Sequence, residues 1–174
     1  DLCIQCGQCS IVCPHSVIRA KAYDGGLLDK APEGFPSAPV NARGYPEKRF
    51  TLHIAVEDCT GCGICVDHCP VHDPLDPGIR AINLNERLPL VQSGRRNLAF
   101  FESLPEHARE QVDLHLARGL QFVRPLFEYS GACAGCGETP YLKLLSQLFG
   151  DRLQIANATG CSSIYGGNLP SLPW

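Results

Sequence analysis

The clearest hydrophobic pattern in the N-terminal half lies at residues 50–56. The segment Phe50-Thr51-Leu52-His53-Ile54-Ala55-Val56 mixes β-branched and apolar residues, which predicts a strand. Residues 80–84 are expected to form a shorter counterpart strand. Residues 23–49 are instead rich in glycine and proline, so they predict a long surface loop that covers another part of the chain.

The pattern changes to helical spacing in the second half of the chain. Apolar residues recur at every third position up to Leu104 and at every fourth position up to Leu120. Residues 94–129 are therefore expected to form a helical connector. Pro125 and the glycines of residues 131–137 end it.

A second helix is predicted between Thr139 and Gly150. Thr139 and Pro140 suit the N-cap and the first helical position, and Gly150 suits the residue that follows the helix. Residues 152–156 then predict a buried strand that leads into a turn at residues 159–163. This order of helix, strand and loop predicts the beginning of an α/β domain.

Two cysteine-rich segments form an internal repeat. Residues 1–14 and 57–70 align at an offset of 56 residues and share four cysteines, one glycine and a proline. Each copy continues into Ile-Arg-Ala, at residues 18–20 and 79–81. The repeat predicts two similar folding units that pack about a pseudo-twofold axis.

Both copies have the spacing C-x2-C-x2-C-x3-C-P. In this spacing three thiolates surround one [4Fe-4S] cluster, and the fourth cysteine ligates the other cluster. Gly7 and Gly63 are expected to give the turns their backbone freedom. The alternatives are zinc sites, which use separate C-x2-C pairs, and structural disulfides. The predicted ligands are Cys3, Cys6, Cys9 and Cys69 for cluster 1, and Cys59, Cys62, Cys65 and Cys13 for cluster 2.

The net charge and the distribution of apolar residues exclude some classes of function. A net charge of −3 without a basic stripe argues against a nucleic-acid partner. No run reaches the roughly 18 apolar residues of a membrane span, and no signal-peptide pattern is present, so we expect a cytoplasmic protein that does not contact a membrane. The eleven cysteines are an odd number, and the absence of methionine indicates an internal fragment of a longer protein.

Three cysteines, Cys133, Cys136 and Cys161, lie outside the repeat. They are one ligand short of a cluster. From the residues alone, the Cys133 and Cys136 pair fits a redox dithiol or half of a zinc site, and Cys161 fits an ordinary buried cysteine. The six histidines show no ligand spacing, so surface or packing roles are expected for them.

Two C-terminal segments carry a family resemblance. SGACAGCGETPY (130–141) and NATGCSSIYGGN (157–168) resemble the start of the thiamine-diphosphate domain of pyruvate:ferredoxin (flavodoxin) oxidoreductases, and the long loop between the cysteine motifs is similar to that family too. The resemblance implies that Cys133, Cys136 and Cys161 bind a third, proximal [4Fe-4S] cluster whose fourth ligand lies outside this chain. It also implies that Glu138 and Cys161 contact thiamine diphosphate, although a carboxylate at position 138 equally suits a helix N-terminus.

The resemblance further implies a domain order and a function. The fold class expected is α+β: a two-cluster ferredoxin-like domain with a long insertion at 1–92, a helical linker at 93–129, and the truncated start of an α/β domain for thiamine diphosphate and Mg²⁺ at 130–174. The parent enzyme would convert pyruvate and coenzyme A to acetyl-CoA and CO2 and pass electrons through three clusters to ferredoxin or flavodoxin.

No catalytic residue is expected in this segment. The family's magnesium-diphosphate motif, activating glutamate and pyruvate-binding arginine lie outside it, and the full-length enzyme is expected to be a homodimer. The alternatives are a stand-alone two-cluster carrier, the electron subunit of another 2-oxoacid oxidoreductase, and a form fused to a flavin domain that reduces NADP.

Overall fold

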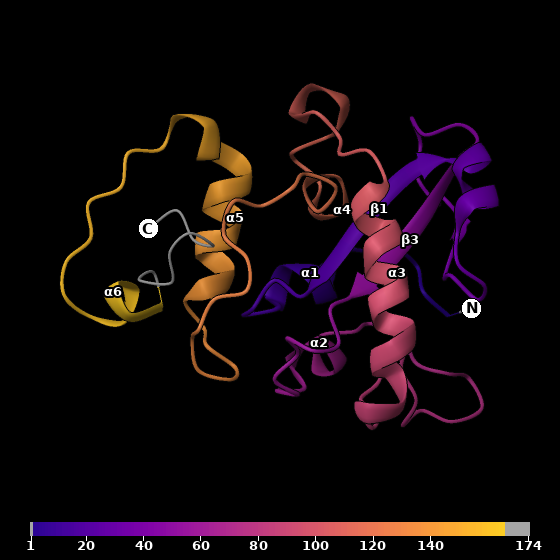
Figure 1. Ribbon diagram of the computed structural model, residues 1–174, viewed down its shortest axis with the longest axis horizontal. Helices are drawn as coiled ribbons and strands as arrows, with labels where there is room; N and C mark the ends of the chain where they lie inside the picture. Colours follow the sequence, from indigo (N-terminus) through magenta and orange to yellow (C-terminus); the bar gives the residue numbers. More distant parts are fainter. Residues whose placement is uncertain (1, 166–174) are drawn as a thin grey trace.

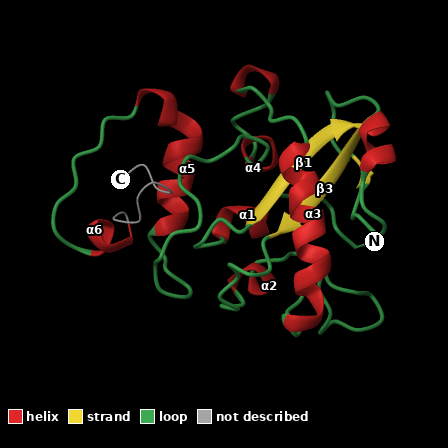
Figure 2. Cartoon of the chain, viewed as in Figure 1, coloured by secondary structure: helices red, strands yellow, loops and turns green. Residues whose placement is uncertain are grey.

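Three antiparallel strands form the one sheet in the part of the chain that the computed structural model describes, residues 2–165 (Figure 2). The strands are β1 (Ile18–Asp24), β2 (Ala38–Pro39) and β3 (Lys48–Ile54), in the order β1-β3-β2. β1 pairs with β3 along its whole length, from Ile18 opposite Ile54 to Asp24 opposite Lys48. The sheet thus joins the strand that leaves the first cysteine motif to the strand that enters the second.

The described residues contain six α-helices, and α5 and α6 lie together to one side of the sheet (Figure 1). α3 packs against β3, α1 contacts α2, and α5 packs on the opposite side of α1. The helices are α1 (Gln8–Val12), α2 (Ile64–Asp67), α3 (Val91–Ser103), α4 (Ala117–Leu120), α5 (Thr139–Phe149) and α6 (Cys161–Tyr165), and shorter 3-10 helices span Gly25–Lys30, Leu88–Leu90, Arg109–Gln111 and Gly150–Arg152. The mixture of strands and helices confirms the α+β class.

β1 is buried on both faces because its alternate side chains have different partners. Ala20 and Ala22 pack with Phe50 and Phe122 in an apolar core. On the other face the Lys21 ammonium, 1% exposed, donates to the carbonyls of Phe101 (3.0 Å) and Leu104 (2.7 Å) at the end of α3. A lysine buried in a strand therefore also donates hydrogen bonds to carbonyls at the end of a helix.

Two buried histidines, His15 and His53, and the half-buried His107 have packing roles, as expected from the sequence. His53 stacks on Phe101, with ring centroids 5.2 Å apart, and a ring nitrogen of His107 lies 2.7 Å from the Ala22 carbonyl oxygen. His15 hydrogen-bonds the Ser130 carbonyl. These contacts connect the sheet to α3 and to the chain that precedes α5.

Two predicted elements are confirmed, with shifted ends. The strand expected at residues 50–56 is β3, and the helix expected after Thr139 is α5. Glu138 and not Thr139 precedes the first helical residue, and Gly150 follows the helix with a right-handed φ of −56°. β1 is a strand that the sequence analysis missed, and it takes up the first two residues of the predicted 23–49 loop.

Two predicted strands are wrong. At residues 80–84 only one isolated bridge, His72 to Arg80, forms, because the Asn83 side chain bonds both the N–H and the carbonyl of Arg80. Residues 152–156 are irregular and largely exposed. Among the described residues no other strand pairs with them, and an unpaired strand leaves its backbone groups unsatisfied.

The helical connector is only partly confirmed. α3 covers its first third, but the region expected to continue as a helix up to Leu120 contains only one short 3-10 helix and α4. The Asp113 carboxylate accepts from the His115 N–H, which is a turn contact that competes with helix. A Cβ on Gly119 would lie 2.2 Å from the Asp113 carbonyl oxygen, so the chain folds back tightly on itself here.

Candidate functional site

Four predicted ligands of cluster 1 line one cavity beside β3. Three come from the loop that runs into α1, and the fourth comes from the end of the second motif. Phe50, Leu52 and Ile82 provide the apolar part of the wall. The four cysteines are Cys3, Cys6, Cys9 and Cys69.

The four predicted ligands of cluster 2 line a second cavity, in which the two motifs exchange roles. Cys13 comes from the end of α1, and the other three, Cys59, Cys62 and Cys65, come from the second motif. In each cavity the cysteine contributed by the other motif is the buried one, Cys13 at 7% and Cys69 at 8% exposure. The structure therefore groups the eight thiols as the crossover spacing predicts, and α1 and α2, which contact each other, hold the two cavities together.

The two motifs also repeat their backbone conformation. Gly7 and Gly63 precede α1 and α2 with φ of 80° and 81°, in the left-handed region that glycine adopts without strain. Two residues earlier, Gln5 and Gly61 have φ of 58° and 69°. The freedom predicted for Gly7 and Gly63 is confirmed, and Gln5 is the one position of the four that carries a side chain.

That side chain fixes the long loop to the first cavity. The Gln5 amide donates to the Pro39 carbonyl at 2.7 Å, and its oxygen accepts from the Asn41 N–H at 2.7 Å. The Gln5 N–H itself points to the Cys3 sulfur at 3.4 Å. The loop expected to cover another part of the chain thus covers the first cysteine motif. Sequence reasoning missed Gln5, although its alignment with Gly61 in the repeat was a signal.

Burial and the neighbouring thiols disfavour ionisation of the cysteines in both cavities. Burial, and after it the neighbouring Cys3 and Cys6, raise the pKa of Cys9 to about 12. Burial and the neighbouring Cys13 raise the pKa of Cys65 to about 11. Such thiols become thiolates when positive charge is bound between them, and iron supplies it.

The donor set, the cavities and the backbone fit a [4Fe-4S] cluster at each position. Four cysteines line each cavity, and in the first motif the Gln5 N–H is directed at a cysteine sulfur. All eleven cysteines are free of disulfides. In the described part of the chain, no three His, Cys, Asp or Glu side chains are close enough to hold a single metal ion.

The third cysteine group lies at the start of α5. Cys133 and Cys136 share one turn, in which the Cys136 N–H donates to the Cys133 carbonyl at 3.0 Å. Burial raises the pKa of Cys136, but hydrogen bonds from the Thr139 and Glu138 N–H groups outweigh it, so that the pKa is lowered. The turn has Gly135 in a left-handed conformation, like the glycines of the other two motifs.

Cys161 begins α6 and is exposed. Tyr165, at the end of the same helix, packs edge-on against Phe127. Burial, and after it the Glu138 carboxylate, raise the pKa of the Tyr165 hydroxyl to about 12, and the thiols of Cys136 and Cys161 add to this. Glu138 and the two thiols thus lie close enough to Tyr165 to oppose its ionisation.

This third group adjoins the second cavity. A Cβ placed on Gly135 would lie 3.6 Å from Ile64 Cδ1 and 4.0 Å from Cys62 Cβ. The Cys133–Cys136 turn therefore packs on the second motif.

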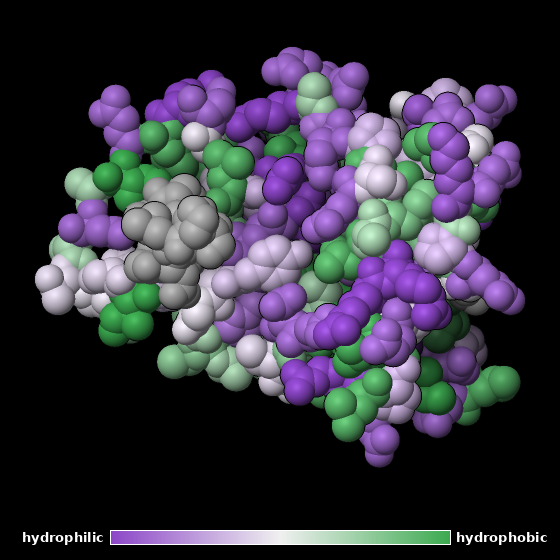
Figure 3. Space-filling view, in the orientation of Figure 1, coloured by the Kyte–Doolittle hydropathy of each residue, from purple (hydrophilic) through white to green (hydrophobic). Residues whose placement is uncertain are grey.

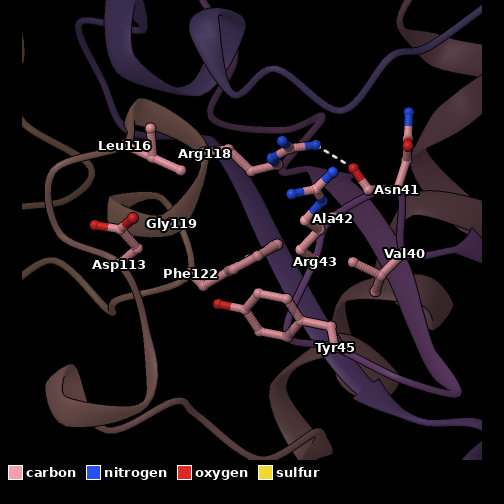
Figure 4. A pocket seen from close by; sticks show the side chains of 10 residues that line it. All are labelled: Val40, Asn41, Ala42, Arg43, Tyr45, Asp113, Leu116, Arg118, Gly119 and Phe122. Carbon is pink, nitrogen blue, oxygen red and sulfur yellow. Dashed lines mark hydrogen bonds between the residues drawn. The ribbon is translucent and has the colours of Figure 1, made fainter.

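A further cavity, which no motif predicts, opens between the long loop and α4 (Figure 4). Tyr45 and Phe122 form its floor, and Arg43 and Arg118 project across it. Arg118 also donates to the Asn41 carbonyl oxygen, which closes the cavity on the side of Cys6. Its lining holds no cysteine.

Comparisons with known proteins agree with this geometry. Residues 2–72 match the family model of the 4Fe-4S dicluster domain. Together with the two four-cysteine cavities, this match indicates an iron–sulfur electron-transfer domain. No helix in the described residues has the length and hydrophobicity needed to cross a membrane.

Relatives identify the protein more closely. The whole chain is 56% identical to the pyruvate-flavodoxin oxidoreductase of Trichormus variabilis and 52% identical to the probable pyruvate-flavodoxin oxidoreductase of Escherichia coli, and it spans 15% of each. It is 44% identical over 172 residues, 99% of its length, to the pyruvate:ferredoxin oxidoreductase of Moorella thermoacetica, of which it spans 14%. The chain therefore belongs to the pyruvate-flavodoxin oxidoreductase family, as a segment of about one seventh of the length of these relatives, and the resemblance inferred from the sequence is confirmed.

Proposed function

We propose that this chain is the electron-transfer segment of an enzyme that oxidises pyruvate with coenzyme A and reduces flavodoxin or ferredoxin. The observation that carries the proposal is the pair of cavities, each lined by four thiols drawn from both motifs. Cys3, Cys6, Cys9 and Cys69 would hold one [4Fe-4S] cluster, and Cys13, Cys59, Cys62 and Cys65 the other. Bound clusters would supply one-electron transfer, which needs no acid or base from the protein.

We further infer that residues 130–174 begin a thiamine-diphosphate domain, with Cys133, Cys136 and Cys161 as ligands of a third cluster and Glu138 beside the thiamine. The lowered pKa of Cys136 supports a thiolate ligand there. Hydrophobic residues gather on the surface around α5 and the segment after it (Figure 3), among them Phe149, Ile155 and Ile164. An apolar surface of this kind suits packing against further parts of a larger domain.

The contact between Gly135 and Cys62 supports an order for the three sites. The third cysteine group would neighbour the Cys13 cavity, and the Cys3 cavity would lie farther along. A stand-alone carrier fits the chain less well, because residues 73–174, beyond the dicluster match, also align with the relatives.

The ligand sets can be tested with matched serine variants of anaerobically purified protein. We expect the two cavities to contribute roughly eight iron and eight sulfide ions. If the crossover is right, Cys69→Ser changes the EPR spectrum of the reduced protein in the same way as Cys3→Ser, and Cys13→Ser in the same way as Cys59→Ser. A Cys69→Ser spectrum that matches Cys59→Ser would refute the crossover, and stoichiometric zinc without visible charge-transfer absorbance would refute the clusters.

The order of the sites can be tested with the same substitutions in the full-length enzyme, during reduction by pyruvate. We expect Cys3→Ser to leave the other clusters reducible while flavodoxin reduction is lost. Cys59→Ser is expected to stop reduction of the cluster held by Cys3. If Cys59→Ser leaves that cluster reducible at the normal rate, the proposed order is wrong.

A further inference from the structure

Helix α5 turns its polar side chains inward and several of its apolar ones outward. The side chains that it buries are all polar, and they recur at helical spacing on one face. Tyr141 is 72% exposed and Phe149 is 42% exposed. This arrangement is the reverse of an ordinary amphipathic helix. The side chains of this buried polar stripe therefore require neighbouring groups that form hydrogen bonds with them. The stripe is Thr139, Lys143, Ser146 and Gln147.

Lys143, at 1% exposure, is the charged member of this stripe. Its ammonium donates to the Ser10 carbonyl oxygen at 2.6 Å and to the Ser10 hydroxyl at 3.0 Å. Ser10 is itself fully buried, and its hydroxyl lies within hydrogen-bonding distance of the Ile18 carbonyl and the Gln121 side chain. The ammonium is therefore held at a fixed place on helix α1.

The charge of this ammonium has no carboxylate beside it. Among the described residues, no carboxylate oxygen lies within 4.0 Å of the Lys143 Nζ. Burial lowers the pKa of Lys143 to about 8, and the charge of Arg19 adds to this, while the thiols of Cys13 and Cys9 and the more distant Glu128 carboxylate act in the opposite direction. A buried cation without a hydrogen-bonded carboxylate is costly, so this environment favours a further negative charge nearby.

The position of Ser10 indicates where that negative charge lies. Ser10 follows Cys9, which lines the first cavity, and precedes Cys13, which lines the second. Lys143 thus sits on the short helix that separates the two cavities, on the side of α5. A cubane on four thiolates is anionic and gains one more negative charge when it takes up an electron.

We propose that Lys143 is a positioning residue whose buried positive charge stabilises the reduced state of the two clusters, most strongly the one held by Cys13. This inference rests on the proposed function, because it requires clusters in the two cavities. The ammonium keeps its proton, and no atom is transferred; an arriving electron stays in the cluster, and the fixed charge lowers the free energy of that more negative state. Through this contact, α5 and the chain that follows it affect the reduction potentials of the N-terminal domain.

The test is an EPR-monitored redox titration of cluster-loaded, anaerobically purified protein. Lys143→Gln keeps an N–H donor for Ser10 but removes the charge, and Lys143→Arg keeps the charge. Lys48→Gln is the matched control, because its side chain is 40% exposed on β3. A unit charge on the order of 10 Å away, at an effective dielectric constant of about 20, changes an equilibrium by about tenfold.

We expect Lys143→Gln to lower the ratio of reduced to oxidised cluster about tenfold at a fixed potential, a shift of about 59 mV for one electron. Lys143→Arg should shift it by less than half as much, and Lys48→Gln should leave it unchanged. Unchanged potentials in Lys143→Gln, or equal shifts in the glutamine and arginine variants, would overturn the inference.

The iron and sulfide content of the two Lys143 variants decides the remaining outcomes. If the glutamine variant loads no clusters while the arginine variant does, the charge is needed to hold the anionic clusters, which supports the inference. If both variants fail to load, the lysine has only a packing role and the inference is wrong. Normal iron and sulfide in the unmodified protein separates these results from a failure of the proposed function itself.

Discussion

The duplicated glycines Gly7 and Gly63 allow the cost of a methyl group to be compared at equivalent positions. Both have φ near 80°, and an alanine in this left-handed region costs about 1–2 kcal/mol. At Gly63 the nearest atom to the added Cβ is Leu84 Cδ1 at 3.8 Å, an ordinary contact. Gly63→Ala should therefore cost about 1–2 kcal/mol, a factor of about 5–30 in the folding equilibrium.

Gly7 has the same backbone but less room. The Cβ of an alanine would lie 3.2 Å from the Arg118 Cα and 3.3 Å from the Gln121 Cγ, and at least the backbone of α4 has to move. Overpacking of this kind adds about 1–3 kcal/mol. Gly7→Ala is expected to cost about 2–5 kcal/mol in total, because strain and crowding act together.

The assay is the rate at which the visible cluster absorbance is lost in guanidinium under anaerobic conditions. Loss of the cluster makes unfolding irreversible, so stability is measured here as a rate. Gly25→Ala is the control, because its φ is not positive and its nearest contact is 3.6 Å. Gly25→Ala is expected to lose its cluster absorbance at the rate of the unmodified protein. Gly63→Ala should lose it faster, and Gly7→Ala fastest. If Gly63→Ala bleaches as fast as Gly7→Ala, or if neither is accelerated, the reasoning is refuted.

Two further perturbations follow from the buried polar residues of the sheet. Burial, and after it the charge of Arg19, lower the pKa of His53 to about 4. Between about pH 6.5 and pH 4, this histidine is therefore protonated in the unfolded chain but neutral in the native chain. Stability should be complete above about pH 6.5 and fall by up to about 1.4 kcal/mol per pH unit down to about pH 4, and His53→Phe should flatten this slope in bleaching rates. Glu106→Gln removes the carboxylate 2.8 Å from the buried Lys21 ammonium and should destabilise by about 1–3 kcal/mol in thermal unfolding. Glu57→Gln, at an exposed pair, should change the unfolding temperature little, and equal effects of the two glutamine variants would contradict this account.

The grouping of the eight repeat cysteines was predictable because it is encoded locally in the motif spacing. Two copies of one spacing determine which thiols lie on one turn, and the crossover rule then pairs each set of three with Cys13 or Cys69. The structure groups the thiols around the two cavities in that way. β3 and α5 were also predictable from local signals, although their ends differ from those expected.

The failures arise where distant contacts decide. β1 alternates apolar residues with Arg19 and Lys21, but alanine has a low preference for strands, and the two buried charges are balanced by Glu106 and Glu128, which lie far away in the sequence. Residues 152–156 have the pattern of a strand but no strand beside them in the described chain. The polar stripe of α5 was visible at helical spacing, but the sequence alone could not reveal that Ser10, far away in the chain, covers it.

The side chain of Gln5 makes the two copies of the repeat unequal. Gly61 has no side chain with which to hold a neighbouring segment, whereas Gln5 accepts the strain of a left-handed backbone and fixes the long loop at Pro39 and Asn41. The second motif is therefore a turn without such a cover, and the first motif is covered by the long loop. After such a duplication the two halves can no longer be exchanged, because a first motif carrying glycine would lose its cover and a second motif carrying glutamine would have nothing to hold.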